Sequence, residues 1–452
     1  MQIIVVGCGK VGRTIIEQLS MENHDVTVID TNSSVIHDVT NNFDVMGVVG
    51  NGASYGVQTE AGIEHADLLI AMTDSDELNL LCCLIAKKAG GCNTIARVRN
   101  PVYNNEIGFI KEELGLSMAI NPEAAAATEI ARILRFPSAI KIETFAKGKV
   151  ELLKFIIGED SILNNCSLID VAKSIKSEVL VCAVERGDDV IIPNGSFVLK
   201  HDDTISIVAS PKNSREFFQK IGVETHQVKN SMIVGGGTIA YYLAKELLNS
   251  GIDVKIIDKD HARCEQLSEL LPEAVIINGD ATNQDTLMEE GLVHAESFVS
   301  LTGIDEGNIF LSLYAKSCSK AKIVTKINRI SYDEIINDFH LGSLIYPKFI
   351  TAENIVRYVR AMQNTVGSNV ETLYKIIGNK AEALEFLITA DAPVVGIPLG
   401  ELKLKDNLLI ASINRAGEIL TPKGKSQIQV GDTVIIVTTH MSLHDIKDIL
   451  RD

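Results

Sequence analysis

The residues best suited to bind a ligand form a glycine-rich turn near the start of the chain. The segment Gly7–Gly12 (GCGKVG) follows a run typical of a strand and precedes a run typical of a helix. In that setting Gly7 permits a tight turn, Gly9 lets a pyrophosphate approach the backbone, and Gly12 lets helix and strand pack closely. The start of the helix adds free N–H groups and the positive end of the helix dipole. The segment therefore predicts a dinucleotide site.

An acidic residue stands where the ribose of such a ligand would lie. Asp30 ends the next predicted strand, 18 residues after Gly12. A carboxylate at this place can accept hydrogen bonds from the hydroxyls of the adenosine ribose, and its charge repels a 2'-phosphate. We therefore expect NAD+ or NADH to be favoured over NADP. The alternative is a glycine-rich turn in an α/β protein that binds no nucleotide.

The same pattern occurs a second time in the chain. Met232–Ala240 (MIVGGGTIA) repeats the first strand and turn, so that Gly235 corresponds to Gly7, and Asp258 to Asp30. The second turn ends in Ala240, which is an accepted variant at the position where the helix packs on the strand. We expect a nucleotide to bind the second site more weakly, or not at all.

The ends of further predicted strands carry polar residues. Thr73 and Asp74 follow the fourth strand of the first half, and Thr302 and Gly303 follow that of the second. This is beside the crevice where open α/β sheets bind ligands. The threonines can also cap the next helix, and the two roles are compatible. Asn51 follows the third strand, near the expected adenine, although an ordinary turn residue is the alternative.

Each half has one basic residue on its fifth predicted strand. Arg97 in the first half and Lys326 in the second can reach a phosphate of the nucleotide. The alternative for each residue is a surface ion pair. The sequence does not decide between these two roles.

We find no constellation of residues that would catalyse a reaction. Tyr241 and Lys245 have the spacing of a dehydrogenase pair, but they fall on the helix after the second glycine turn, behind the phosphates. His440 and His444 have the spacing of metal ligands on a helix, but no third ligand accompanies them. We therefore expect neither an enzyme nor a metal site.

The elements that must position these residues also occur twice. Short apolar runs alternate with helical patterns in residues 1–135 and 230–362, which predicts two Rossmann-like, doubly wound parallel sheets. Turn-separated, half-buried strands follow in 136–224 and 369–452, which predicts a small α+β domain after each sheet. The expected class is α/β, with four domains in 452 residues.

The predicted strands of the small domains are apolar on one face. A domain of about 85 residues buries little core alone. We therefore expect each small domain to pair with the same domain of a neighbouring chain. Symmetric closure of such pairs would give a dimer or a ring.

The composition excludes several classes of function. The net charge of -17 argues against a nucleic-acid binder, which needs clustered Lys and Arg. The eight cysteines show no C-x-x-C spacing, so we expect reduced thiols in a cytosolic protein. The longest apolar stretch, Ser231 to Ala244, is interrupted by glycine and is shorter than the ~20 residues of a spanning helix.

The order of these motifs resembles one known family. GCGKVG with Asp30 is followed by GNGAS, MTDSDELN and ARVRNP, and the whole arrangement is doubled, with a strand-rich domain closing each half. This is similar to the TrkA family, the peripheral NAD-binding subunits of bacterial and archaeal Trk potassium uptake systems, whose module is called RCK or KTN. The resemblance covers essentially the whole chain. It departs from the family at Arg99, where Asn is frequent, and at Gly303, where a polar residue is expected.

The resemblance implies that NAD+ or NADH is the cofactor, with other adenine nucleotides such as ATP or ADP as alternatives. In the first half it implies a site made of Gly7, Cys8, Gly9, Lys10, Val11, Asp30, Asn51, Thr73, Asp74 and Arg97. In the second half it implies Gly235, Gly236, Gly237, Thr238, Ile239, Asp258, Thr302 and Lys326.

The resemblance also implies partners. RCK modules assemble as homo-oligomers, dimers or tetrameric rings, that dock on a TrkH-like potassium transporter at the cytosolic face of the inner membrane. The expected function is thus a non-enzymatic, NAD(H)-sensing regulatory subunit of potassium ion transport. Two alternatives stay open: an NAD-dependent dehydrogenase, which shares the fold and the cofactor, and a free-standing nucleotide sensor.

Overall fold

The structure is a computed structural model of the chain. It describes all residues except 136–140, 146–148, 188, 224–226, 330–338, 340, 365–369, 377–379, 390–391, 441–442, 444 and 452. The chain divides into two compact units, and each unit takes one part from each half of the sequence. Unit 1 comprises Met1–Ala131 with Lys229–Val356, and unit 2 comprises Arg132–Val228 with Arg357–Asp452.

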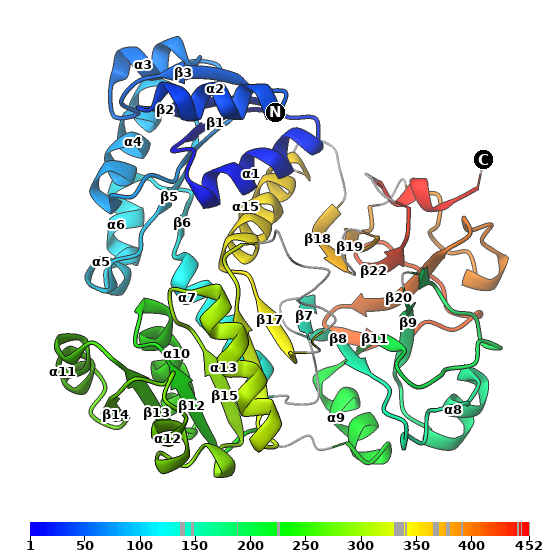
Figure 1. Cartoon of the computed structure of the whole chain (residues 1–452). Coiled ribbons are helices and arrows are strands. Elements are labelled where there is room, and N and C mark those ends of the chain that lie inside the picture. Colours follow the sequence, from blue (N-terminus) through cyan, green and yellow to red (C-terminus); the bar gives the residue numbers. More distant parts are fainter. Residues whose placement is uncertain are drawn as a thin grey trace. The chain divides into compact units, whose positions relative to one another are not determined.

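Unit 1 contains two six-stranded parallel sheets with the same strand order (Figure 1). The first sheet is ordered β3-β2-β1-β4-β5-β6, and the second β14-β13-β12-β15-β16-β17. This is the order of a doubly wound nucleotide-binding fold, in which the chain changes direction of winding between the first and fourth strands. The predicted α/β class and its duplication are confirmed.

The elements of the first module follow the predicted alternation. Its strands are β1 (Gln2–Val6), β2 (Asp25–Asp30), β3 (Met46–Val49), β4 (Leu68–Ala71), β5 (Asn93–Arg97) and β6 (Met118–Ile120). Its helices are α1 (Lys10–Met21), α2 (Ser33–Asn42), α3 (Tyr55–Glu60), α4 (Asp76–Ala89), α5 (Pro101–Asn105), α6 (Ile107–Leu114) and α7 (Pro122–Arg135).

The second module repeats this sequence of elements. Its strands are β12 (Asn230–Val234), β13 (Asp253–Asp258), β14 (Val275–Asn278), β15 (Ser297–Ser300), β16 (Lys322–Lys326) and β17 (Ser343–Ile345). Its helices are α10 (Thr238–Asn249), α11 (His261–Leu270), α12 (Gln284–Glu289), η2 (Leu292–His294), α13 (Asp305–Cys318) and α15 (Pro347–Asn364).

The central strands are buried because they are apolar on both faces. In β1, Val5 is fully buried and pairs with Val28 of β2 and with Ile70 of β4, both also fully buried. Helices on the two sides of a parallel sheet cover both of its faces. A ligand can therefore reach the ends of these strands and not their faces, and open α/β sheets bind ligands at the carboxyl ends of their strands.

Unit 2 contains two five-stranded antiparallel sheets that are also copies of each other. The first sheet is ordered β10-β9-β11-β8-β7, and the second β18-β19-β22-β20-β21. The elements of the first are β7 (Lys141–Phe145), β8 (Val150–Ile156), α8 (Leu168–Ile175), β9 (Leu180–Arg186), β10 (Asp189–Ile191), β11 (Thr204–Ala209) and α9 (Pro211–Lys220). Those of the second are β18 (Val370–Ile376), β19 (Ala381–Leu387), η3 (Leu399–Glu401), β20 (Leu408–Arg415), β21 (Glu418–Leu420), β22 (Thr433–Thr438) and η4 (Ile446–Ile449).

One apolar cluster joins the two small sheets. Val150, Leu152 and Cys182 of the first sheet belong to the same buried cluster as Ala411 and Val437 of the second. The sequence led us to expect that this face pairs with a neighbouring chain. The structure covers it within the chain instead, because duplication supplies a second copy of the same face.

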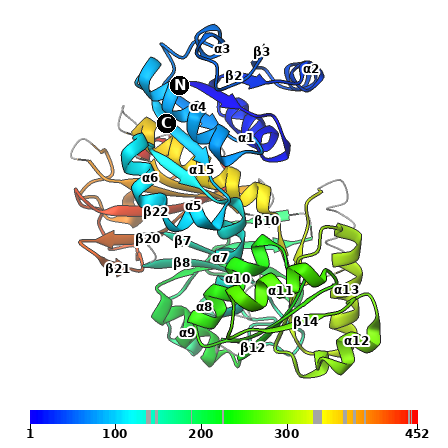
Figure 2. The same cartoon turned by 90° about the vertical axis from the view of Figure 1, so that its left-hand side faces the viewer.

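The two modules of unit 1 contact each other through helices α7 and α10 (Figure 2). Asn121 immediately precedes α7, and its side-chain amide donates a hydrogen bond to the hydroxyl of Tyr242 on α10, at 3.0 Å. Further along the same helices, Thr128 donates to the carboxylate of Glu246. The helix that ends the first module therefore packs beside the helix that begins the second.

Candidate nucleotide-binding site

The first glycine turn joins β1 to α1 in a conformation that requires glycine. Gly7 has a φ of +94°, and its N–H donates to the carbonyl of Ile29 at 2.8 Å. A Cβ added at Gly7 would lie 2.9 Å from backbone atoms of Met72 and Thr73, and one added at Gly12 would lie 2.0 Å from the carbonyl oxygen of Gly7. Only glycine fits both positions in this geometry.

The middle glycine of the turn has open space around it. A Cβ added at Gly9 would meet no atom within 4 Å. Gly9 precedes α1, and no described residue accepts a hydrogen bond from the N–H groups of Gly9, Lys10 or Val11. These groups are the unsatisfied donors of a helix start, and they can bind the oxygens of a phosphate.

Asp30 lies at the end of β2 with its carboxylate turned toward the glycine turn. Its Oδ2 accepts the N–H of Cys8 at 2.8 Å, and its Oδ1 accepts the N–H of Asn32 at 2.9 Å. Each carboxylate oxygen has two acceptor positions, so both can still accept a hydroxyl. Asp30 therefore fixes the turn and keeps capacity for a ribose.

Thr73 lies after β4 in a network that ties two strand ends together. The side-chain oxygen of Asn79 accepts from the N–H and the hydroxyl of Thr73, at 2.8 and 2.7 Å. The side-chain nitrogen of Asn79 donates to the carbonyls of Thr73 and Arg97, at 3.1 and 3.0 Å. The cap of helix α4 is Ser75, which accepts from Leu78 N–H, so Thr73 is not the cap.

The guanidinium of Arg97 lies beneath these strand ends. Its side chain is 8% exposed, and its Nη2 donates to the carbonyl of Thr73 and to Asp74, whose Oδ1 is 3.0 Å away. The carboxylate of Asp74 is fully exposed. The Nε of Arg97 has no hydrogen-bond partner among the described residues. The ion pair is therefore half-buried, and a donor remains free at the carboxyl edge of β5.

The second module reproduces the turn and the acid. Gly235 has a φ of +98°, and Asp258 accepts the N–H groups of Gly236 at 2.5 Å and Asp260 at 2.8 Å. A Cβ at Gly237 would meet no atom within 4 Å, as at Gly9. Residues Thr238 and Ile239 form the start of α10, as Lys10 and Val11 form that of α1.

The carboxyl edge of the second sheet differs in charge. Thr302 and Asn308 repeat the network of Thr73 and Asn79, at 2.9 and 2.7 Å. Lys326 replaces the arginine, and its ammonium donates to the carbonyl of Leu301 at 3.1 Å. Burial lowers the pKa of Lys326. Gly303 stands where the first module has Asp74, so the exposed carboxylate is missing here.

Asn51 and its counterpart Asp280 lie in turns after the third strand of each module. The side chain of Asn51 accepts from Ala53 N–H at 2.9 Å, and that of Asp280 accepts from Thr282 N–H at the same distance. Both are exposed turn residues at the carboxyl edge. Asn51 thus has the geometry of an ordinary turn residue, which was the alternative to a binding role. Its side chain nevertheless lies at the edge of the sheet where adenine would bind.

Sequence reasoning missed a buried acid that holds the edge together in each module. Asp76 accepts the N–H groups of Arg99 and Asn100, at 2.8 and 2.7 Å. Asp305 accepts those of Asn328 and Arg329 in the same way, at 3.0 and 2.8 Å. The signal was present in the sequence, because an acid and an amide recur three residues apart in TDSDELN and TGIDEGN.

The residues that resemble catalytic or metal sites lie elsewhere. Tyr241 is buried on α10, whereas Lys245 is exposed on the same helix. The ring of His440 hydrogen-bonds the carbonyl of Asp406 at 2.7 Å, and His444 lies outside the described residues. Across the described part of the chain, no group of three His, Cys, Asp or Glu side chains could hold a metal ion.

The cysteine in the first glycine turn is not poised to react. Burial, followed by the nearby charge of Asp30, raises the pKa of the Cys8 thiol to about 12. A thiol is a nucleophile only as the thiolate, which is scarce at neutral pH when the pKa is this high. Cys8 therefore serves the turn through its backbone.

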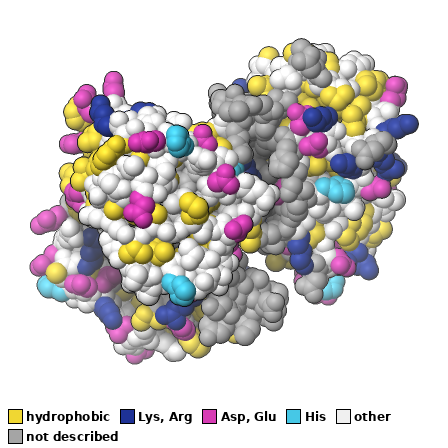
Figure 3. Space-filling view, turned by 90° about the horizontal axis from the view of Figure 1, so that it is seen from above, with side chains coloured by type: hydrophobic (Ala, Val, Ile, Leu, Met, Phe, Trp, Pro, Cys, Tyr) yellow, Lys and Arg dark blue, Asp and Glu magenta, His cyan; other side chains and the backbone are white. Residues whose placement is uncertain are grey.

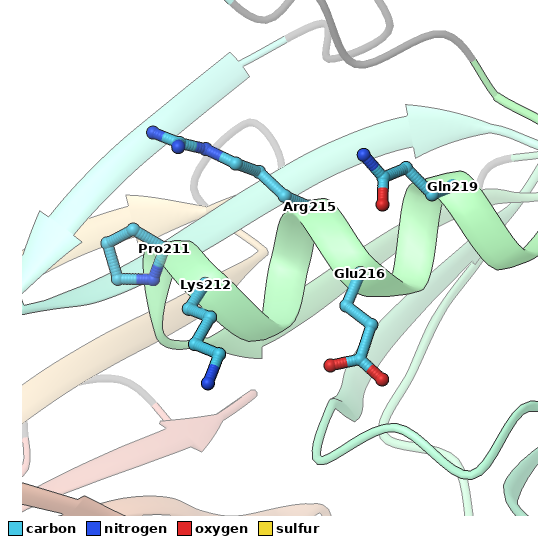
Figure 4. Close-up of a pocket in the computed structure, with 5 residues that line it drawn as sticks. All are labelled: Pro211, Lys212, Arg215, Glu216 and Gln219. Atoms are coloured by element: carbon cyan, nitrogen blue, oxygen red, sulfur yellow. The ribbon is translucent and has the colours of Figure 1, made fainter.

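Unit 2 has a hollow beside helix α9. It is lined by Pro211, Lys212, Arg215, Glu216 and Gln219, and Lys212 and Glu216 point to one side of the helix while Arg215 and Gln219 point to the other (Figure 4). On the face of the molecule shown in Figure 3, Lys and Arg side chains lie interspersed with Asp and Glu.

No helix in the described part of the chain is both long and apolar enough to cross a membrane.

Comparison with known proteins agrees with this geometry. Residues 3–122 and 231–347 match the TrkA-N domain, and residues 152–222 and 383–451 match the TrkA-C domain. A Trk system potassium uptake protein TrkA homolog of Methanosarcina mazei is 30% identical over 455 residues, covering 99% of each chain. TrkA of Halomonas elongata is 31% identical over 439 residues, covering 96% of this chain and 95% of that one.

Among solved structures, the GsuK channel is similar in fold. It superposes with a TM-score of 0.64 at 17% sequence identity, over 97% of this chain and 76% of that one. A structure described as the GsuK channel bound to NAD has a TM-score of 0.63 over the same shares. At this level of identity the likeness concerns the fold.

Proposed function

Because the chain belongs to the TrkA family of potassium uptake proteins, we propose that it is the NAD(H)-binding regulatory subunit of a membrane potassium transporter. The observation that carries the proposal is the glycine turn of each module. Free N–H groups at a helix start, open space at Gly9 and Gly237, and an acid at the end of the second strand are what a dinucleotide requires.

We propose that both modules contain a site with the predicted residues. In the first module these are Gly7, Cys8, Gly9, Lys10, Val11, Asp30, Asn51, Thr73, Asp74 and Arg97. In the second they are Gly235, Gly236, Gly237, Thr238, Ile239, Asp258, Thr302 and Lys326. The four domains would then be 1–135, 136–224, 230–362 and 369–452.

The proposed subunit acts without turnover. A dehydrogenase needs an acid or base beside the nicotinamide. Two buried ionisable residues at the carboxyl edges have structural partners instead: Asp76 accepts two backbone N–H groups, and Lys326 donates to a carbonyl. A screen of alcohols, hydroxy acids and amino acids with NAD+ should give no sustained formation of NADH. Steady, stoichiometric reduction of NAD+ by one of these substrates would establish the dehydrogenase alternative.

Regulation follows if the nucleotide binds one arrangement of the modules better than another. A ligand shifts a conformational equilibrium only by its difference in affinity for the two states. The hydrogen bond between Asn121, which precedes α7, and Tyr242 on α10 joins the carboxyl edge of the first sheet to the second module. We propose that a homo-oligomer of the chain transmits this change to a TrkH-like transporter at the cytosolic face of the membrane.

Two measurements test this function. Calorimetry with NADH, NAD+, NADP+ and ADP on the full chain should show tight binding of NADH or NAD+. Potassium flux in liposomes that contain a TrkH-like transporter should then depend on added chain and respond to the nucleotide. Absence of nucleotide binding, or flux that ignores the chain, would refute the proposal.

A further inference from the structure

One basic side chain lies against the glycine turn in each module, and it comes from a different helix each time. In the first module, Nε of Arg13 on α1 donates to the carbonyl of Cys8, at 3.3 Å. In the second, Nε of Arg263 on α11 donates to the carbonyl of Gly236, at 2.5 Å. Cys8 and Gly236 are equivalent residues, each lying between the first two glycines of its turn.

The second contact of each guanidinium is also equivalent. Nη1 of Arg13 lies 2.5 Å from the carboxylate of Asp38 on α2, and Nη1 of Arg263 lies 2.5 Å from the side-chain oxygen of Gln266 on α11. Helices α2 and α11 begin and end at matching positions, with Asp38 and Gln266 both sixth in the helix. The two guanidinium groups therefore occupy the same place in the two modules.

The sequence hides this equivalence because the arginine has changed position. Tyr241 stands where the first module has Arg13, and Val35 stands where the second has Arg263. Tyr241 is buried and packs against its neighbour Tyr242, with ring centroids 5.2 Å apart. The two modules therefore have a guanidinium at the same place in the fold, although the arginines stand at different positions of the repeat.

From this retention we infer that Arg13 and Arg263 are positioning residues for the nucleotide phosphates, an inference that rests on the proposed function. The residue between the glycines is held at both ends, since its N–H donates to Asp30 or Asp258 and its carbonyl accepts from the arginine. In a trans peptide the carbonyl and the next N–H point in opposite directions. Holding the carbonyl of Cys8 toward Arg13 turns the N–H of Gly9 the other way, to the open side of the turn.

The alternative is that the arginine only braces the fold. The ion pair with Asp38 is half-exposed, with side-chain exposures of 39% and 51% for Arg13 and Asp38, and pairs of this kind contribute little to stability. In the second module the partner is the neutral Gln266, and Arg263 has no ion pair among the described residues. The bond to the carbonyl in the turn, by contrast, is of the same kind in both modules.

The test uses the full chain with one site silenced. On a Gly237→Val background, Arg13→Leu should weaken the binding of NADH and of ADP about tenfold, which corresponds to one lost hydrogen bond to the turn. Binding of adenosine, which has no phosphate, should change by less than about twofold, because the ribose and adenine contacts remain. The fluorescence of bound NADH measures its own affinity, and the loss of that fluorescence on competition measures the affinities of ADP and adenosine.

The decisive variant moves the arginine to the position it has in the other module. Val35→Arg added to Arg13→Leu should restore the affinity for NADH and ADP, because position 35 matches position 263. The reciprocal set tests the second module on a Gly9→Val background. There Arg263→Val removes the guanidinium and Tyr241→Arg returns it from the other helix. This set serves as the test if the first set does not fold. Circular dichroism and thermal unfolding monitor the fold of every variant.

The outcomes separate the inference from the proposed function. If the unmutated chain binds no nucleotide, the proposed function fails. If it binds nucleotide and the Arg13→Leu variant binds equally well, the inference alone fails. Equal loss for adenosine and for ADP would show that the effect of the arginine is not specific to the phosphates, and loss that Val35→Arg does not rescue would show that a guanidinium at this place is not sufficient. Either result would overturn the positioning role.

Discussion

Asn121 and Tyr242 are 121 positions apart in the chain and form a hydrogen bond of 3.0 Å between the two modules of unit 1. The hydroxyl of Tyr242 also lies 3.3 Å from the carbonyl of Arg99, to which it can donate. One phenol thus contacts the ends of β5 and β6, which form part of the carboxyl edge where the first nucleotide would bind. The tyrosine lies on the helix that follows the second glycine turn, so it connects the two modules.

Replacing this tyrosine tests the connection. Tyr242→Phe removes the hydroxyl and leaves the amide of Asn121 without its partner, which should lower the free energy of unfolding by about 1 kcal/mol. Thermal unfolding measures this change. Tyr241→Phe is the matched control, because Tyr241 is also buried on α10 and has no hydrogen bond to the first module among the described residues. An equal effect of both substitutions would contradict the role of the contact.

Substitutions at two glycines of the first turn should have different effects, one on nucleotide binding and the other on stability. Gly9→Val places methyl groups in the open space of the turn, so it should abolish nucleotide binding and leave the melting temperature unchanged. Gly7→Ala should instead destabilise the module by about 2 kcal/mol, because φ is +94° and the Cβ would meet the backbone of Met72 and Thr73. Calorimetry and thermal unfolding distinguish the two effects. A Gly9→Val protein that binds NADH normally would place the ligand elsewhere.

The acid at the end of β2 should determine both affinity and the choice between NAD and NADP. Asp30→Ala removes the acceptor for the ribose and the one for Cys8 N–H, so we expect NADH to bind at least about tenfold more weakly. The preference for NADH over NADPH should shrink, because the charge that repels a 2'-phosphate is gone. Asp25→Asn, on the exposed start of β2, is the control. Equal affinity of the unmutated chain for NADP would contradict the assignment.

The parallel sheets could be predicted because their strands are covered on both faces. A strand that is buried on both faces has apolar residues at every position. A continuous apolar run such as IIVV in β1 therefore indicates a buried parallel strand. The tight turns at Gly7 and Gly235 could be predicted as well, because a positive φ between a strand and a helix admits few residues other than glycine. The family resemblance could also be predicted from the sequence, because its motifs consist of residues that the geometry of the turn and the strand ends constrains.

Side-chain partners across the fold could not be predicted. A strand position places Arg97 at the edge of the sheet, but only the folded packing decides that its guanidinium lies under the carbonyl of Thr73. The role of Arg263 was invisible, because its counterpart Val35 is apolar and the matching cation is Arg13. The small domains show the same limit, since an apolar face on β8 indicates a partner without indicating which chain supplies it.

A bidentate ion pair in each small domain gives a prediction for acid. Arg186 donates through Nε and Nη2 to the two oxygens of Asp203, both at 2.7 Å, and Arg415 and Asp432 repeat this at 2.9 and 2.8 Å. Burial acts to raise the pKa of Asp203, but the hydrogen bonds from Arg186 and from the N–H of Lys200 outweigh it, so the pKa is lowered overall.

A lowered pKa in the folded chain fixes the sign of the effect. The contribution of Asp203 to stability is complete above the unfolded pKa of about 3.9, and it is lost as the pH falls through the lower folded pKa. Asp203→Asn should cost about 2 kcal/mol at pH 7 and should show a shallower loss of stability below pH 4 than the unmutated chain. Denaturant unfolding at several pH values measures both. Asp202→Asn, with an exposed side chain, is the control; the same acid profile in Asp203→Asn and the unmutated chain would contradict the prediction.

The last prediction concerns the apolar cluster between the two small sheets, and Cys182 reports on it. Cys182 is fully buried in that cluster, and burial raises its pKa to about 12. The thiolate is the nucleophile that attacks a thiol reagent, so Cys182 should stay unmodified as long as the sheets remain packed together. Ala411→Asp puts a charge into the same cluster, where Ala411 is 2% exposed, and should separate the sheets because an unpaired charge is costly to bury.

In Ala411→Asp, mass spectrometry should therefore find Cys182 modified at least about ten times faster, since modification follows the population of the open form. The newly exposed face should also promote association between chains, which light scattering detects. Val430→Asp, at an exposed position of the same small domain, is the matched control and should change neither quantity. Protection of Cys182 in Ala411→Asp, with the chain still folded, would show that the second sheet does not cover the first. The pairing face would then be free for a neighbouring chain, as the sequence alone suggested.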